Sequence, residues 1–445
     1  MLINFKVKNY RSYKNQADFA MLTGKNLKKF SNNKFEIDKT VNNEGLKLLK
    51  NSIIFGSNGS GKSNLIKALK TMKDIVISNR NRTKERITRT PFLLDNNSID
   101  NPTIFSVEFI IEGFQYLYEF SFNENEFFYE KLDYICKDEY VNYFYRSNEK
   151  KCIPKNLKEE YEKTRNNVLF LYSAQNANDN HAIRVMKWFI DKLLFIDEHL
   201  NGGEINDLQH LIKNDDTKRQ IIDFLKLCDV NIVDIDTILD ESHEKFKKFF
   251  KEQSKERGFS ISEIYDELDK ERYDLVLTYK KFDENGHMIG TENIQFFSES
   301  EGTKKLLTLV LNLFNLRNEN KVVIMDEFDD SLHLNLSKIL VNIFNQVKNY
   351  NQFILTSHQL NLLDCNLRID QIYFTEKYYD GSTELYSMFD FIDDSKGSRN
   401  DISKLKRYME GVYGAIPNVD ANDFNAFKNI LDFDLSYGGV TNGEE

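Results

Sequence analysis

Gly56-Ser57-Asn58-Gly59-Ser60-Gly61-Lys62-Ser63 matches the phosphate-binding pattern G-x-x-x-x-G-K-[ST] at every defined position. Glycines let the backbone curve around phosphate groups, so that successive N–H groups and a helix N-terminus point at them. The ammonium group of Lys62 is then expected to reach the β- and γ-phosphates, and the hydroxyl of Ser63 to bind Mg²⁺. We predict that all eight residues take part in binding the phosphates of a nucleotide.

The segments on either side of this loop supply the context that the pattern requires. Ser52-Ile53-Ile54-Phe55 is an apolar run typical of a buried strand, and residues 64–70 have the spacing of a helix. A chance turn rich in glycine and serine is the alternative interpretation. A strand before the loop and a helix after it favour phosphate binding.

The composition is that of an ordinary globular protein. Of its 445 residues, 40% are hydrophobic and 29% are charged, and the length allows two or three domain-sized units. No apolar run approaches the roughly 20 residues that span a bilayer, and the N-terminus lacks the organisation of a signal peptide. The four cysteines are scattered and form no C-x-x-C pair, which is typical of thiols in a reducing compartment. We therefore expect a cytoplasmic protein without membrane contact.

The net charge of −10 argues against a protein that coats nucleic acid through a broadly basic surface. Two local basic clusters are nevertheless present. The first comprises Arg80, Arg82, Lys84, Arg86 and Arg89. The second is Lys245-Phe246-Lys247-Lys248-Phe249-Phe250-Lys251, which has helical spacing. A solvated surface is the favoured interpretation of each cluster, and contact with DNA or RNA is the alternative.

Residue periodicity indicates how the rest of the chain is organised. Ile104–Ile111 and Gln115–Phe122 alternate with a period of two around Glu112-Gly113, which predicts an antiparallel hairpin. From about residue 155 to 268 the spacing is helical, with helices expected at Ala182–Ile196, Thr217–Cys228 and Ile235–Lys255.

Strands and helices alternate after residue 270. Strands are expected at Tyr273–Tyr279, Lys321–Met325 and Gln352–Thr356, and helices at Gly302–Arg317 and Leu334–Lys348. This alternation predicts a parallel sheet, here interrupted by a helical insertion. We divide the chain into an N-terminal lobe (1–150), a helical insertion (151–268), a C-terminal lobe (269–380) and a C-terminal extension (381–445).

Asp326-Glu327 directly follows the apolar strand that ends at Met325. Open α/β sheets bind their ligands at the carboxyl ends of their strands. Asp326 is therefore expected to hold Mg²⁺, and Glu327 to act as the base that polarises the attacking water. An Asp-Glu pair also commonly ends a strand at the surface, but the apolar strand and the phosphate loop upstream favour the catalytic interpretation.

Two further segments bracket this strand. Ser298-Glu299-Ser300-Glu301-Gly302-Thr303 opens a helix upstream, and Leu355-Thr356-Ser357-His358 ends the next strand downstream. The second segment places His358 at the same sheet edge as Glu327. A histidine after a strand is usually structural, whereas a neutral imidazole at this edge would orient water and report the state of the nucleotide.

The order of these motifs resembles that of the ABC-type ATPases related to SMC proteins and to RecF-type repair ATPases. It is more similar still to the prokaryotic AAA-family ATPases of the abortive-infection and RloA-like antiphage group. The similarity runs from residue 1 to about residue 419 and includes Asp330-Ser331-Leu332-His333 and three terminal motifs, namely Phe5–Tyr13, Leu367–Ile372 and Gly411–Asn418.

This resemblance implies the fold of an ABC-type P-loop head: an α/β protein with a mixed, largely parallel sheet, antiparallel strands and a helical insertion. Ser300 and Gly302 would cap the γ-phosphate of the opposite protomer, and Asp330-Ser331 would form a loop at the dimer interface. His358 would be the switch histidine, and Arg11 would approach the nucleotide.

Two features depart from the group. Its usual glutamine loop is not recognisable, because Gln115 lies in the expected hairpin, where a structural role is favoured. The insertion has neither a long heptad pattern nor a C-x-x-C hook, which argues against a long coiled-coil arm.

The resemblance further implies an ATPase that uses ATP and Mg²⁺ and closes as a homodimer or higher oligomer. A phosphate loop alone leaves one face of the triphosphate in water, and a helix N-terminus of a partner would supply the missing N–H donors. It also implies antiphage defence through a separate effector protein, since the chain after His358 shows no evident nuclease constellation.

Two other classes stay open. One is a RecF- or SMC-like ATPase of DNA maintenance, which DNA-stimulated hydrolysis without an effect on phage infection would favour. The other is a non-hydrolysing, ATP-gated scaffold that holds a toxin partner. Stable ATP-bound oligomers with negligible turnover would favour that scaffold.

Overall fold

A six-stranded sheet forms the centre of the molecule. The computed structural model describes residues 1–25, 27–37, 45–78, 85–136, 139–196, 200, 202–257, 271–317, 319–346, 350–391 and 403–415. The strand order is β11-β15-β16-β5-β17-β18, in which the first five strands are parallel and β18 is antiparallel to β17. These strands are β5 (Asn51–Gly56), β11 (Leu193–Ile196), β15 (Val322–Met325), β16 (Gln352–Ser357), β17 (Ile372–Lys377) and β18 (Thr383–Ser387). The predicted mixed, largely parallel sheet is confirmed.

A seven-stranded antiparallel sheet forms the second layer, in the order β10-β9-β8-β7-β6-β1-β2. Its strands are β1 (Leu2–Lys8), β2 (Ala17–Ala20), β6 (Thr103–Ile111), β7 (Phe114–Phe122), β8 (Phe127–Cys136), β9 (Glu139–Ser147) and β10 (Lys151–Cys152). The predicted hairpin is confirmed as β6 and β7. Glu112 and Gly113 both have positive φ, 48° and 80°, as a tight turn between twisted strands requires.

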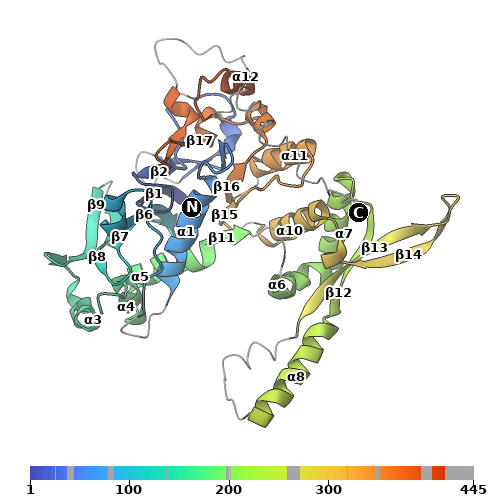
Figure 1. Ribbon diagram of the computed structural model, residues 1–445, viewed down its shortest axis with the longest axis horizontal. Coiled ribbons are helices and arrows are strands. Elements are labelled where there is room, and N and C mark those ends of the chain that lie inside the picture. The colour runs from blue at the N-terminus through green and yellow to red at the C-terminus, as the bar shows by residue number, and fades with distance from the viewer. Residues whose placement is uncertain are drawn as a thin grey trace, which may run out of the picture.

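Helix α1 (Lys62–Ile77) lies between the two sheets (Figure 1). Its apolar face shares one core with the antiparallel sheet and with Ile54, Ile324 and Ile354 of the central sheet. The alternate residues of the same central strands point to the other face, where they pack against α10 (Glu301–Asn315) and α11 (Leu334–Phe344). Burial on both faces explains why these strands read as continuous apolar runs.

The region after residue 150 contributes to the head more than its helical spacing predicted. Its first three helices are α3 (Lys158–Lys163), α4 (Phe170–Asn176) and α5 (Asn180–Lys187). The buried side chains of α4 and α5 join the core of the antiparallel sheet, and the partly buried Tyr161 of α3 packs against it. The helix predicted over Ala182–Ile196 is wrong at its end, because α5 stops at Lys187, one π-helical turn follows, and Leu193–Ile196 form β11 beside β15. Residues on both sides of the predicted boundary at 150 thus pack in one core.

The inserted segment is a mixture of helices and strands, so the prediction of a helical insertion was incomplete. It comprises α6 (Gly202–Lys213), α7 (Asp215–Leu227), β12 (Ile232–Leu239), α8 (Glu241–Arg257), β13 (Tyr273–Phe282) and β14 (Met288–Gln295). The predicted helix Thr217–Cys228 is confirmed as α7, which ends at Leu227, one residue before Cys228. The predicted helix Ile235–Lys255 is wrong at its start, because Ile235–Leu239 alternate with a period of two and pair with β13. Helix α8 and the β13–β14 hairpin project from the body of the molecule (Figure 1).

The C-terminal part completes the central sheet. Strand β18 pairs with β17 across the predicted boundary at residue 380, so the two lie in one sheet. Helix α12 (Lys404–Met409) follows. The smaller elements of the chain are α2 (Asn96–Asp100), β3 (Lys34–Glu36) and β4 (Lys47–Leu49). No helix in the part of the chain that the structure describes is both long and apolar enough to cross a membrane.

Candidate functional site at the phosphate loop

The phosphate loop joins the buried strand β5 to α1, as predicted. Gly59 and Gly61 have φ of 72° and 114°, in the region that side chains disfavour. Gly61 also lies against Thr383 of β18: a Cβ atom at residue 61 would stand 2.5 Å from the Thr383 Oγ1 atom. A glycine at position 61 is therefore required both by the backbone conformation and by the neighbouring strand.

Side chains from β17 and β18 form hydrogen bonds with the phosphate loop. The hydroxyl groups of Ser60 and Thr375 are 2.6 Å apart, and the Thr383 hydroxyl donates a hydrogen bond of 2.8 Å to the carbonyl of Ser60. A Cβ atom at Gly56 would lie 2.4 Å from the Thr375 Oγ1 atom. These threonines could not be recognised from the sequence alone, because each belongs to a strand that is distant in sequence.

Lys62 is 3% exposed, and its Nζ atom donates to the carbonyls of Gly56 (2.8 Å) and Ser57 (3.0 Å). Burial lowers the pKa of Lys62 from its usual value to about 8, although Glu327, Asp326 and Asp329 act in the opposite direction. Burial therefore disfavours the charged form of Lys62, and a bound phosphate group would stabilise that form.

The predicted acidic residues meet at the carboxyl ends of β15 and β16. Met325 pairs with Leu355, which brings Asp326 beside Thr356. The Thr356 hydroxyl donates to the Asp326 Oδ1 atom (2.5 Å) and accepts from the backbone N–H of Glu327 (2.7 Å). Thr356 therefore fixes both acidic residues, a role that its apolar surroundings in the sequence did not indicate.

His358 lies between Lys62 and Glu327. Its Nδ1 atom is 3.4 Å from the Lys62 Nζ atom, and its Nε2 atom is 3.2 Å from the Glu327 Oε1 atom. A lysine ammonium group can only donate, so the Nδ1 atom of a neutral His358 accepts and its Nε2–H donates to Glu327. The predicted lysine, histidine and glutamate thus form one hydrogen-bonded series.

Asp329 is a further acidic residue at this edge that the sequence analysis did not identify. It is buried, and the Ser357 hydroxyl donates to its Oδ2 atom at 2.6 Å. Burial raises the pKa of Asp329 above its usual value.

A pocket with a volume of about 490 Å³ opens above these groups. Its lining includes Asn58, Gly59, Gly61, Lys62, Ser63, Asn64, Glu327, Asp330 and His358. Within the described ranges, no group of three or more His, Cys, Asp or Glu side chains could hold a metal ion. Mg²⁺ at phosphate sites needs few protein ligands, because nucleotide oxygens and water complete its shell. Ser63 is among the described residues that line this pocket, whereas Asp326 is not, so the predicted Mg²⁺ site at Ser63 and Asp326 stays a prediction.

The predicted signature residues lie at the start of α10. Ser300 is the N-cap, and its Oγ atom accepts from the N–H of Thr303 at 3.3 Å. Gly302 lies against the same chain's Ser331, whose carbonyl oxygen would be 2.8 Å from a Cβ atom at residue 302. Among the described residues that line the phosphate-loop pocket, neither Ser300 nor Gly302 is present.

Arg11 lies in the turn after β1, with φ of 49°. Its Nε atom donates to the Tyr10 hydroxyl at 3.3 Å, and Arg11 is not among the described residues that line the pocket. Two neighbours of Arg11 contact the start of α1 instead: Ser12 Oγ accepts from the Asn64 side chain (2.8 Å), and the Tyr13 hydroxyl donates to the Gly61 carbonyl (3.1 Å). The contact of Arg11 with nucleotide stays a prediction.

Gln115 has the structural environment that the sequence favoured. It is buried in the β6–β7 hairpin, and its Nε2 atom donates to the Glu108 Oε1 atom at 2.5 Å.

Ile196, the last residue of β11, pairs with Met325, so β11 ends at the same edge as Asp326. Residues 197–199, which follow, lie outside the described residues.

The two basic clusters are partly described. Arg80, Arg82 and Lys84 lie outside the described residues. Arg86 pairs with Glu124 at 3.7 Å, and Lys245 pairs with Glu241 at 3.6 Å. Exposed ion pairs of this kind suit a solvated surface. Of the last resembling motif, residues 416–418 are also outside the described part, whereas Tyr413 stacks on Phe374 in the core.

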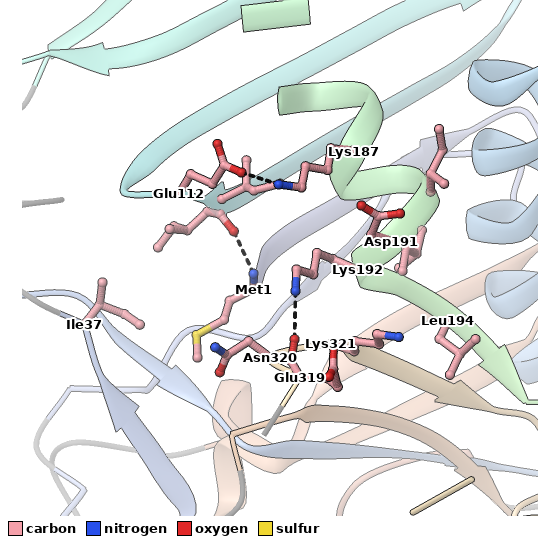
Figure 2. Close-up of a pocket in the computed structure, with 14 residues that line it drawn as sticks. Met1, Ile37, Glu112, Lys187, Asp191, Lys192, Leu194, Glu319, Asn320 and Lys321 are labelled. Atoms are coloured by element: carbon pink, nitrogen blue, oxygen red, sulfur yellow. Dashed lines mark hydrogen bonds and ion pairs between the residues drawn. The ribbon is translucent and has the colours of Figure 1, made fainter. Parts of the chain in front are cut away.

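A larger pocket of about 790 Å³ lies at the opposite, amino-terminal edge of the central sheet (Figure 2). Figure 2 shows two of its lysines engaged with neighbouring residues: Lys187 pairs with Glu112 at 2.6 Å, and Lys192 donates to the Glu319 carbonyl at 2.8 Å. The glycine-rich loop and the Asp-Glu pair are absent from its lining. The phosphate-loop pocket is therefore the better candidate for the functional site, despite its smaller volume.

Comparison with known proteins agrees with this assignment. The profile of one family, described as "AAA domain, putative AbiEii toxin, Type IV TA system", matches residues 52–364, from the strand before the phosphate loop to beyond His358. No curated protein sequence matches the chain.

Three solved structures share 12% sequence identity with the chain and each cover 87% of it. They are an SMC head domain from Thermotoga maritima (TM-score 0.36, 98% of that chain), an SmcHead bound to the C-winged helix domain of ScpA (0.42, 97%), and an Smc head domain with an extended coiled coil, bound to the C-terminal domain of ScpA derived from Pyrococcus furiosus (0.38, 96%). These TM-scores are low, so the fold is defined here by the strand order and the phosphate loop.

Proposed function

We propose that this chain, which belongs to that AAA-domain family, is an ATPase that binds ATP with Mg²⁺ and hydrolyses it between two copies of itself. We further infer that the ATPase acts in antiphage defence and controls a separate effector protein.

The hydrogen-bonded series from Lys62 through His358 to Glu327 is the observation that carries the proposal of hydrolysis. In this series Lys62 would bind the γ-phosphate, and Glu327 would accept a proton from the attacking water. The Nε2–H of His358 holds one carboxylate oxygen of Glu327 and leaves the other for that water. Binding of a phosphate to Lys62 would weaken its contact with the Nδ1 atom, so His358 is suited to link nucleotide binding to the base.

Mg²⁺ would be held by Ser63 and Asp326 together with oxygens of the nucleotide. When bound, the ion supplies positive charge that stabilises the transferred phosphoryl group. Thr356 keeps the Asp326 carboxylate in place through its hydrogen bond of 2.5 Å. The carboxylates of Asp326, Glu327 and Asp329 all act on Lys62, so a cation at this edge would also offset their repulsion of a triphosphate.

Dimerisation is supported by the position of the signature residues. Ser300 and Gly302 start a 15-residue helix, and neither lines the described pocket of its own chain. A helix N-terminus attracts anions through its free N–H groups and its dipole. The start of α10 from a second copy would supply these groups to the open face of a bound triphosphate.

A role in defence is supported by the resemblance of the motifs to the abortive-infection group and by the description of the matching family, which refers to a putative toxin and a type IV TA system. The ATPase head would sense infection, and an effector encoded by another gene would act on the cell. Plaque assays with and without the neighbouring genes would test this part of the proposal.

Phosphate release from ATP by the purified chain, with and without Mg²⁺, tests the proposed activity. We expect release that depends on Mg²⁺, and a dimer that light scattering detects with ATP but not with ADP. Absence of phosphate release in the presence of ATP, Mg²⁺ and the products of the neighbouring genes would contradict the ATPase assignment. Hydrolysis by a chain that stays monomeric would contradict the shared site.

A further inference from the structure

Lys305 connects the signature helix to the proposed catalytic base. It lies in the second turn of α10, is 8% exposed, and its Nζ atom donates to the backbone carbonyl of Glu327 at 2.5 Å. The same carbonyl accepts from the N–H of Asp330 at 3.0 Å, which closes the turn after β15. Lys305 therefore attaches α10 to the turn that carries the base.

Glu327 needs such support because its backbone is strained. Its φ is 46°, a left-handed conformation that costs a residue with a side chain about 1–2 kcal/mol. Two elements hold it there: Thr356 of β16 accepts from its N–H, and Lys305 of α10 donates to its carbonyl. The direction of the Glu327 side chain toward His358 depends on this backbone conformation.

Helix α10 also contacts the inserted segment. Its apolar face packs against α6 and α7 in one core, and Figure 1 shows α10 between these helices and the central sheet. The Thr308 hydroxyl accepts from the N–H of Leu200 at 3.2 Å, and Arg317 donates to Gln220 of α7 at 3.0 Å. Any displacement of the inserted helices would therefore move α10.

The packing between α10 and β15 leaves room for a small shift. A cavity of about 20 Å³ lies beside Lys305, Thr308 and Asp326, enough for about one water molecule. At the first turn of α10, the close approach of Gly302 to the Ser331 carbonyl provides a second contact with the same catalytic turn.

We propose that Lys305 is a positioning residue for Glu327, through which the position of α10 sets the rate of ATP hydrolysis. The proposal rests on the proposed role of Glu327 as the base. Because α10 also presents Ser300, closure on a partner's nucleotide and movement of the inserted segment would both reach Glu327 through Lys305.

Single-turnover hydrolysis by Lys305→Met tests the proposal. We expect the rate to fall about 10- to 100-fold, because a small misplacement of a catalytic group lowers the rate by a factor of this order. The Kd of ATP should change less than about threefold. Lys305→Arg keeps a donor and should recover most of the rate. Lys73→Met is the matched control, since Lys73 also donates to a backbone carbonyl, that of Leu193 at 2.6 Å, far from Glu327.

A double variant separates positioning from general loss of stability. If Lys305 acts through Glu327, adding Lys305→Met to Glu327→Gln should leave the residual rate unchanged, because the two effects are not additive. A rate for Lys305→Met equal to that of Lys73→Met would overturn the proposal. The proposal would also be overturned if Lys305→Met lowered the rate of the Glu327→Gln variant by the same factor as it lowers the wild-type rate. A wild-type chain without hydrolysis would instead overturn the proposed function itself, and the positioning role with it.

Discussion

The Nε2 atom of His358 lies 3.2 Å from the Oε1 atom of Glu327, at the carboxyl edge of the central sheet. The other nitrogen of the ring lies 3.4 Å from the Nζ atom of Lys62. One imidazole therefore contacts both the residue proposed to bind the γ-phosphate and the residue proposed to activate water. Replacing Lys62 is therefore expected to affect ATP binding, whereas replacing Glu327 is expected to affect hydrolysis.

Glu327→Gln should abolish most hydrolysis while ATP still binds, because the amide cannot accept a proton but keeps the size of the side chain. We expect the rate to fall about 10²- to 10⁴-fold, the usual contribution of a general base. His358→Ala should lower it less, since it removes the orientation of the base and not the base. Phosphate release and calorimetric ATP affinity would measure both effects. A wild-type rate for Glu327→Gln would show that another group is the base.

ATP binding should take up protons at alkaline pH because of Lys62. Burial lowers the pKa of this lysine to about 8, so its amine is about half charged at that pH in the free protein. The triphosphate favours the charged form and raises the pKa in the complex. ATP affinity should therefore fall as the pH rises above about 8, and proton uptake should increase.

Calorimetry in two buffers with different ionisation enthalpies would measure this uptake. The control is Lys62→Arg, whose guanidinium group stays charged and should bind ATP without taking up a proton. An uptake that stays at zero from about pH 7 to about pH 9 would contradict the lowered pKa of Lys62.

Two buried threonines should give different defects when each is replaced by valine of nearly the same shape. Thr356→Val removes the hydrogen bonds to Asp326 and Glu327, so we expect slower hydrolysis and weaker Mg²⁺ dependence. Thr375→Val removes the contact with Ser60 and should weaken ATP binding. Each leaves buried polar groups without a partner, which costs about 1–3 kcal/mol. Denaturant unfolding would show that the two losses of stability are similar, and an exchange of the two functional defects would contradict the assignment.

The sequence was sufficient to predict the groups that follow apolar strands directly. Asp326, Glu327 and His358 each come just after such a run, and Lys62 ends the loop that follows another. Parallel strands end at one edge, so their convergence could be expected. The nucleotide-facing loop was predictable for the same reason. The positions of these residues follow from the direction of the strands that precede them.

The remaining contacts depend on tertiary structure. Thr356 and Thr375 lie within apolar strands, and only the strand order shows which residues they meet. Leu193–Ile196 form a strand because they pair with β15. From the sequence alone, four apolar residues after a helix fit either a strand or a continued helix. Lys305 follows the signature motif, and nothing in its spacing indicates that its ammonium group reaches the Glu327 carbonyl.

Ser300→Asp is the sharpest test of a site shared between two copies. Ser300 caps α10 through the N–H of Thr303, and aspartate caps a helix about as well as serine, so the helix should stay intact. The added carboxylate would face the γ-phosphate of the partner, where like charges repel strongly. Gly302→Asp would be a poorer choice, because its Cβ atom would lie 2.8 Å from the Ser331 carbonyl of the same chain.

We expect Ser300→Asp to lose hydrolysis while its own phosphate loop still binds ATP, and the matched neutral variant Ser300→Asn to keep much of the activity, because asparagine also caps the helix. Mixing Ser300→Asp with Lys62→Ala should restore part of the activity. A mixed dimer joins an intact Lys62 from one copy to an intact Ser300 from the other, which gives one working site of two. Differently tagged copies would verify subunit exchange, and a slowly hydrolysed ATP analogue would detect binding if both sites must act together. A wild-type rate of hydrolysis by Ser300→Asp alone would refute the shared arrangement and leave a P-loop ATPase that works within one chain.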